Sequence, residues 1–139
     1  LHVAVAGEMI AEASLFSDKY HCSAMADRPS RIYRISRDDA LRQVLEGDQA
    51  SHKIMALFAR QIRDLRGLIE IRNIRSASDR ILAYLNSMAD SDGKAEISYS
   101  VRDMAYKLGL AHETAYRALR QLEQGGRLRR EGIGIFYLR

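Results

Sequence analysis

The stretch SVRDMAYKLGLAHETAYRALRQLEQ, residues 100–124, decides the fold of this chain. Ser100 is a typical N-cap residue and precedes a predicted helix of about Val101–Leu108. Gly109 follows at the point where a helix end needs a positive φ, which glycine adopts without steric cost. A second helix of about His112–Gln124 comes next. The residues expected to face inward in a tight helix–turn–helix are Met104, Ala105, Leu108, Leu110, Ala115 and Ala118.

A two-stranded hairpin is expected after the second helix. Gly125 and Gly126 end that helix, and an Arg-rich run then leads into a Glu131-Gly132 turn and the apolar stretch Ile133–Leu138. Two helices followed by a basic hairpin are typical of a winged helix–turn–helix. The sequence therefore predicts an α+β fold with a DNA-binding motif in its last third.

A long helix is predicted upstream, from about Gln49 to about Arg72. Its apolar residues repeat every 3.5 positions, the spacing that pairs two helices, and they are Met55, Phe58, Ile62, Leu65 and Ile69. A second apolar stripe lies beside this seam and consists of Ile54, Leu57, Leu68 and Ile71. A helix that is apolar on two faces is expected to contact both its own domain and a second subunit, so we expect a homodimer seam. The alternative is one wide buried face in a monomer.

Shorter signals place the other elements. Asp38 is a candidate cap for a helix that runs to about Leu45, and Gly47-Asp48 interrupts it. Ser76 and Ser78 are candidate caps for a helix of about 78–88, and a turn follows at 90–93. We place the domain boundary in a short hinge at about 73–77. Residues 1–6 and roughly 21–36 mix apolar and polar residues as half-buried strands do, and they are too few for a core of their own, so we expect the chain to begin inside a domain.

Charge and composition narrow the function. Residues 94–139 contain nine basic and five acidic side chains, whereas residues 1–93 contain 13 of each. Arginine supplies 18 of the 22 basic residues, which suits phosphate and base recognition, although a basic face that only contacts solvent is the alternative. No apolar run has membrane-spanning length, and Cys22 is the one cysteine, so no membrane partner and a cytoplasmic location are expected.

The N-terminal end of the second helix of a helix–turn–helix enters the major groove. The side chains at this end of the predicted helix are of types that can bind bases. Glu113 and Arg117 are four residues apart and project from one face. Arg can bind guanine O6 and N7, and Glu can accept from cytosine N4, whereas the alternative is a plain surface ion pair. We expect His112, Glu113 and Arg117 to read bases. The residues suited to the DNA backbone are Ser100, Arg102, Lys107, Thr114, Tyr116 and Arg130.

These motifs together resemble the cyclic-AMP receptor / fumarate–nitrate regulator (CRP/FNR) family of bacterial transcription regulators. GLAHETAYRALRQLE, residues 109–123, resembles the recognition helix of the family, and GEMIAEASLF, residues 7–16, resembles the start of its ligand cassette. The resemblance spans nearly the whole chain. It implies the C-terminal half of a cyclic-nucleotide-binding-type β-barrel over 1–46, a dimerisation helix over 47–73, and a winged helix–turn–helix DNA-binding domain over 74–139.

The resemblance also implies an effector pocket, formed by Gly7, Glu8, Glu12, Cys22 and Ser23. All but Cys22 match the cyclic-AMP binders of the family, which have an arginine for the phosphate at that place. Losing that arginine removes a bidentate charged donor, so the sequence argues against a cyclic nucleotide and leaves the cofactor unknown.

The sequence also argues against metal, redox and iron–sulfur sensing. Neighbouring residues on a strand point to opposite faces, which argues against a metal shared by His21 and Cys22. Redox sensing by Cys22 lacks a nearby resolving cysteine, and an iron–sulfur cluster needs several. His112 stands where the cyclic-AMP receptor has an arginine, so a changed half-site is expected.

The leading prediction is a dimeric, sequence-specific DNA-binding transcription regulator whose barrel acts on DNA binding through the long helix and hinge. Double-stranded DNA and a second copy of the chain are the expected partners, with RNA polymerase as a further one. The alternative is a constitutive DNA-binding dimer with a degenerate, ligand-free barrel, which Cys22 favours and Glu12 argues against. An enzyme is not expected, since the four histidines lack metal-ligand spacing and the sequence has no Gly-rich phosphate loop.

Overall fold

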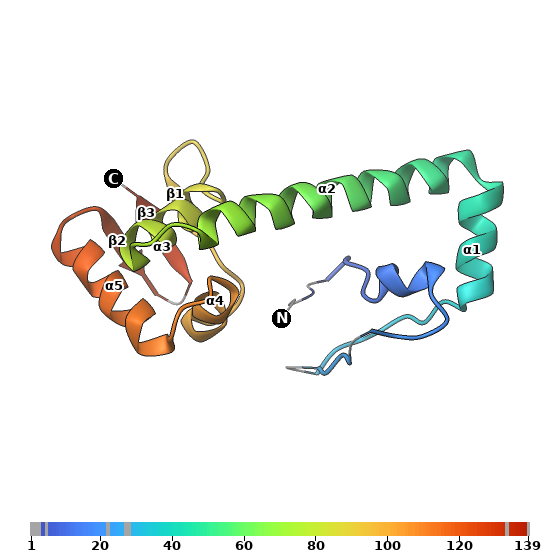
Figure 1. Ribbon diagram of the computed structural model, residues 1–139, viewed down its shortest axis with the longest axis horizontal. Coiled ribbons are helices and arrows are strands. Elements are labelled where there is room, and N and C mark those ends of the chain that lie inside the picture. Colours follow the sequence, from blue (N-terminus) through green and yellow to red (C-terminus); the bar gives the residue numbers. More distant parts are fainter. Residues whose placement is uncertain (1–3, 5, 22, 27–28, 133, 139) are drawn as a thin grey trace. The chain divides into compact units, whose positions relative to one another are not determined.

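The computed structural model describes residues 4, 6–21, 23–26, 29–132 and 134–138 (Figure 1). It is a mixed helix and strand structure that divides into two compact units, His2–Gln61 and Ile62–Arg139. The division falls inside the long helix, and the hinge boundary at 73–77 stays a prediction. None of the helices in the described part of the chain combines the length and apolar character that a bilayer crossing needs.

The N-terminal unit contains the 3₁₀ helix η1 (Glu12–Phe16), helix α1 (Arg37–Glu46) and the first part of α2 (Asp48–Arg72). Ser36 caps α1, because its hydroxyl accepts a hydrogen bond from the backbone N–H of Asp39 at 3.1 Å. The predicted cap, Asp38, is wrong: it lies within the first turn, where its negative charge suits the positive end of the helix.

The strands predicted at 1–6 and 21–36 are absent from the described residues of those ranges. A strand is stable when its backbone groups pair with a neighbouring strand and one of its faces is buried. Neither condition holds here: Ile32 is 67% exposed, Tyr33 is 88% exposed and Ile35 is 69% exposed. The mixture of apolar and polar residues therefore predicted strands that the described residues of these ranges do not form.

The C-terminal unit contains helices α3 (Ala77–Asn86), α4 (Val101–Lys107) and α5 (His112–Gln124) and a three-stranded sheet (Figure 1). The strands are β1 (Lys94–Glu96), β2 (Leu128–Glu131) and β3 (Ile135–Leu138). They pair antiparallel in the order β1-β3-β2. The hairpin of β2 and β3 and the helices α3, α4 and α5 are as predicted, whereas β1 is an additional element.

The core of this unit lies between α3, α4, α5 and the sheet. Its largest fully buried side chains are Phe136, Ile81, Leu85, Met104, Leu108 and Leu119. The predicted inward positions of the two adjacent helices are confirmed: Met104, Ala105, Leu108, Ala115 and Ala118 are buried, and Leu110 packs partly buried against them. From α2, Leu68 and Ile71 also pack against this core, so the C-terminal end of α2 belongs to the same unit.

Candidate nucleic-acid interface

A capping box starts α4. The Ser100 hydroxyl accepts from the backbone N–H of Asp103 at 3.1 Å, and the Asp103 carboxylate accepts from the backbone N–H of Ser100 at 3.3 Å. This reciprocal pair confirms Ser100 as the predicted cap. It also occupies the Ser100 hydroxyl, which donates to the same carboxylate at 2.6 Å.

A tight turn joins α4 to α5. Gly109 has a φ of 65°, as its place in the sequence predicts, and the backbone N–H of Leu110 donates to the carbonyl of Ala105 at 2.8 Å. Helix α5 then begins at His112, and Ala111 at its N-cap offers no side-chain acceptor. The first-turn N–H groups of α5 therefore form a positive helix end without a side-chain cap.

The exposed face of α5 presents one group of side chains. A shallow hollow of about 450 Å³ is lined by His112, Glu113, Tyr116, Arg117 and Arg120. Glu113 and Arg117 are both exposed, and within the described residues they form no ion pair with each other. The surface-pair alternative for these two residues is therefore not what the structure contains. Arg120 is an addition: its spacing of three from Arg117 and seven from Glu113 could have indicated it.

His112 and Tyr116 contact each other on this face. Their ring centroids are 4.6 Å apart and the planes cross at 64°, an edge-to-face arrangement. Tyr116 also lines a second hollow of about 200 Å³ between the start of α4 and the hairpin turn, together with Tyr99, Ser100, Val101, Arg130, Gly132 and Gly134. The Tyr116 side chain thus borders both hollows and packs against the His112 ring.

The residues expected to contact the DNA backbone differ in how free they are. Arg102 is exposed and Thr114 is partly buried. The Lys107 ammonium lies 5.4 Å from the ring centre of Tyr84 and 5.5 Å from that of Tyr99, which is cation–π distance. Lys107 is thus held against the protein surface, and a phosphate contact would have to draw it away from the two rings.

The two tyrosines under Lys107 are linked by a hydrogen bond between their hydroxyls. Burial raises the pKa of the Tyr99 hydroxyl above its usual range, and the hydrogen bond to Tyr84 raises it further, whereas the charge of Lys107 lowers it. Burial also raises the pKa of Tyr84, against a smaller lowering by the hydrogen bond that it shares with Tyr99. Both hydroxyls therefore keep their protons at neutral pH.

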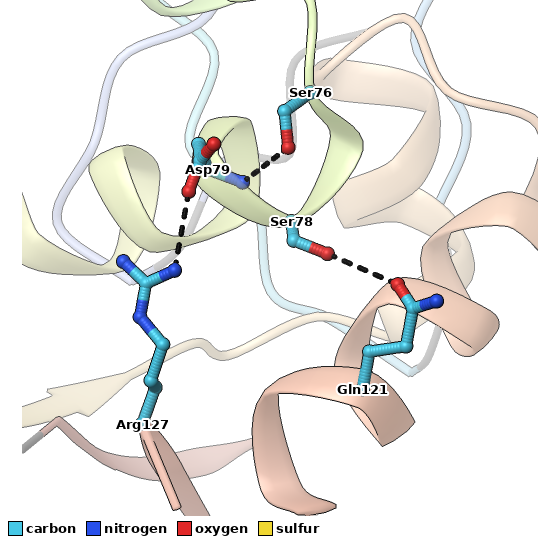
Figure 2. Close-up of polar contacts among 5 residues, drawn as sticks. All are labelled: Ser76, Ser78, Asp79, Gln121 and Arg127. Carbon is cyan, nitrogen blue, oxygen red and sulfur yellow. Dashed lines mark hydrogen bonds and ion pairs between the residues drawn. The ribbon is translucent and has the colours of Figure 1, made fainter. Parts of the chain in front are cut away.

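The described arginines at the start of the hairpin each have an acidic neighbour. Arg127 pairs with Asp79 at 3.3 Å, a contact visible in Figure 2, and Arg130 pairs with Glu123 at 3.4 Å. Arg129 pairs with Glu131 at 3.4 Å and lies 4.3 Å from the ring centre of Tyr137. Such partly exposed pairs are worth at most about 1 kcal/mol, so a phosphate can replace the carboxylate.

The residues expected at an effector pocket lie in the N-terminal unit. Glu12 accepts a hydrogen bond from Gln61 Nε2 on α2 at 2.5 Å. Gly7, Glu8 and Ser23 are exposed, and Cys22 lies outside the described residues. The structure thus connects Glu12 to α2, and the effector pocket itself stays a prediction.

The residues of the expected dimer seam lie along α2. Four are largely exposed: Met55 at 60%, Ile62 at 49%, Leu65 at 59% and Ile69 at 59%, whereas Phe58 is partly buried. The second stripe of Ile54, Leu57, Leu68 and Ile71 is partly buried throughout. The second stripe is therefore less exposed than the seam. Its Leu68 and Ile71 pack against the core of the C-terminal unit, and four of the five seam residues face solvent.

Comparison with known proteins gives matches among solved structures alone. No protein-family model matches the chain, and no curated protein does. FixK2 from Bradyrhizobium japonicum is 27% identical with a TM-score of 0.62, over 76% of this chain and 55% of that one. A CooA mutant from Carboxydothermus hydrogenoformans is 18% identical with a TM-score of 0.62, over 73% and 50%. TTHB099, a CRP-family transcriptional regulator from Thermus thermophilus, is 20% identical with a TM-score of 0.53, over 66% and 49%.

These structures belong to regulators of the CRP/FNR family, so the resemblance that the sequence predicts is confirmed. CooA and TTHB099 support the fold, and FixK2 adds a similarity of sequence. The chain spans about half the length of the regulators it matches.

Proposed function

We propose that this chain acts in a dimeric, sequence-specific DNA-binding transcription regulator of the CRP/FNR type. The observation that carries the proposal is the exposed, mutually unpaired pair Glu113 and Arg117 at the start of α5. A carboxylate and a guanidinium on one helix face match cytosine N4 and guanine O6/N7 in the major groove. The same helix end is positive and lacks a side-chain cap, which favours a nearby phosphate.

In this proposal α4, α5 and the β2–β3 hairpin form a winged helix–turn–helix. α5 is the recognition helix, with His112 beside Glu113 and Arg117 at the bases. Arg102 and Thr114 on the two helices, and Arg130 on the hairpin, contact the DNA backbone. Ser100 contributes to the interface by capping α4. Lys107 contributes its positive charge to phosphate binding once it moves away from the rings of Tyr84 and Tyr99.

A symmetric dimer fits the seam on α2. Four exposed apolar side chains at coiled-coil spacing are costly in water and are covered when a second copy pairs with them. Two-fold symmetry then implies a roughly palindromic site with half-sites about one helical turn apart. The barrel half, the domain boundaries and RNA polymerase as a partner stay predictions.

The test is selection of DNA sites from a random library by the wild-type protein and by Arg117→Ala. Wild type should select one half-site motif. Arg117→Ala should lose about 1–3 kcal/mol of discrimination at one base pair and keep its affinity for unrelated DNA. Arg42→Ala, an exposed arginine on α1, removes the same charge elsewhere and should leave the motif intact. An equal loss on all sequences would contradict base reading by Arg117.

A constitutive dimer is the second candidate, since the residues expected at an effector pocket include exposed ones and Glu12 already has Gln61 as a partner. Thermal-shift screening against nucleotides, haem and small acids separates the two candidates. A ligand that raises the melting temperature supports an effector-controlled regulator, and DNA binding without any such ligand supports the constitutive dimer.

A further inference from the structure

Arg80, on α3, binds two backbone carbonyls from different parts of the C-terminal unit. Its Nε and Nη2 donate to the carbonyl of Ile74 at 2.9 and 2.6 Å, and its Nη1 donates to the carbonyl of Leu108 at 3.1 Å. Ile74 lies in the short segment between α2 and α3, and Leu108 is the C-cap of α4. One guanidinium therefore joins the end of α2 to the turn between α4 and α5.

The chemistry of this contact depends on arginine. The carbonyl of Leu108 ends a helix and lacks a partner within it, and the carbonyl of Ile74 lies in a connecting segment, so each gains from Arg80 a donor that it would otherwise need from water. A planar guanidinium presents several N–H groups in fixed directions and can serve both carbonyls at once. A lysine ammonium is a single point and cannot span two separate acceptors in the same way.

A second contact connects the same two places. A Cβ built on Gly109 would lie 3.0 Å from Nη2 and 3.1 Å from Nε of Arg72, so the guanidinium of the last α2 residue lies against the turn glycine. Two neighbours on α2 also pack against the core of the unit: Ile71, directly before Arg72, and Leu68, one turn earlier. The end of α2 is thus held by apolar packing, by Arg72 and by Arg80.

Helix α3, which carries Arg80, is itself fixed on α5. Ile81 and Leu85 are fully buried in the shared core. At the start of α3, Ser78 donates to Gln121 of α5 at 3.4 Å, and Asp79 pairs with Arg127 (Figure 2). The position of Ile74 is therefore set relative to α5 through α3.

We propose that Arg80 is a positioning residue that holds the end of α2 in one orientation relative to the α4–α5 turn. The segment 73–76 is then a braced connection and not a free hinge. The consequence of this inference for DNA binding rests on the proposed function. If α2 pairs two copies and α5 reads DNA, Arg80 sets the separation of the two recognition helices. It should therefore control the spacing of half-sites without touching the bases.

The experiment compares wild type with Arg80→Ala, Arg80→Lys and the control Arg75→Ala, an exposed arginine in the same connection. Amide hydrogen exchange is measured over 73–76 and 107–110, with α5 as the internal reference. DNA is selected from a library in which two half-sites are separated by spacers of varied length. The lysine variant keeps the charge and most of the side chain, so it tests the bridge if the alanine variant unfolds.

We expect Arg80→Ala and Arg80→Lys to speed exchange in both segments by about tenfold or more, while α5 stays protected. Both variants should keep the half-site motif but accept neighbouring spacer lengths, and Arg75→Ala should match wild type. Faster exchange in α5 to the same degree would show general destabilisation and overturn the inference. So would an unchanged exchange at 107–110, or a single spacer length in both variants. If wild type selects no motif, the proposed function fails, and the exchange data alone still decide whether Arg80 braces the connection.

Discussion

Leu65 gives the sharpest test of the dimer seam, because its contribution to the free energy of dimerisation can be worked from the exposed fraction of its side chain. The residue is 59% exposed on α2. Burying a whole leucine side chain is worth about 1.5–3 kcal/mol, so covering that share is worth about 1–2 kcal/mol per protomer and about 2–4 kcal/mol per dimer. Leu65→Ala removes most of this and should weaken dimerisation by about 30-fold to 1,000-fold. Alanine is a strong helix former, so α2 itself should persist.

The assay is sedimentation equilibrium over a range of protein concentrations, with circular dichroism to verify helix content. Leu45→Ala is the matched control, since Leu45 on α1 is 76% exposed and lies outside the seam. The control should leave the dimer dissociation constant unchanged. Equal dissociation constants for Leu65→Ala and wild type, or an equal weakening in both variants, would refute the reasoning and place the dimer contact elsewhere.

Substitutions at three further positions test the fold and the interface. Gly109→Ala should lower the free energy of unfolding by about 1–2 kcal/mol, because alanine disfavours a φ of 65°; unchanged urea denaturation would mean that the turn relaxes. The folded state holds the Tyr99 proton more tightly than the unfolded chain, so the free energy of unfolding should fall as the pH rises above the unfolded pKa near 10.0. Tyr99→Phe removes this proton and should make the fall less steep. A steeper fall in the variant would contradict this. Tyr116→Ala should free the ring of His112 and relax selection at the base it reads, whereas Tyr116→Phe should keep it; identical selection by both variants would exclude a role for the ring contact.

The helices after residue 76 and the hairpin of β2 and β3 were predictable because their signals are local. Ser76 and Ser100 are caps whose hydroxyls accept from backbone N–H groups three residues on, and Gly109 ends α4 with the expected positive φ. The exposed positions of Glu113 and Arg117 follow from the helical period alone. Local chemistry was sufficient for this region, and the same reasoning located the candidate interface.

The features that the sequence did not predict depend on contacts between distant residues. β1 is only three residues long, and it exists because β3 offers it a partner. The bridge from Arg80 to Leu108 spans 28 positions and has no motif. The strands expected at 1–6 and 21–36 are absent from the described residues for the converse reason: a half-buried strand needs a neighbour, and none of the described residues supplies one.

The acidic neighbours of the hairpin arginines have a consequence for binding in salt. In the proposed complex, a DNA phosphate that takes Arg130 away from Glu123 would leave a carboxylate beside the DNA, and that carboxylate would recruit a cation from solution. The ions released from the duplex are thus partly offset by ions taken up by the protein, so affinity should fall less steeply with ionic strength than the number of arginines suggests. Neutralising the carboxylate with Glu123→Gln should steepen the dependence of affinity on ionic strength and tighten binding to every sequence alike. Glu123 would thus weaken non-specific DNA binding.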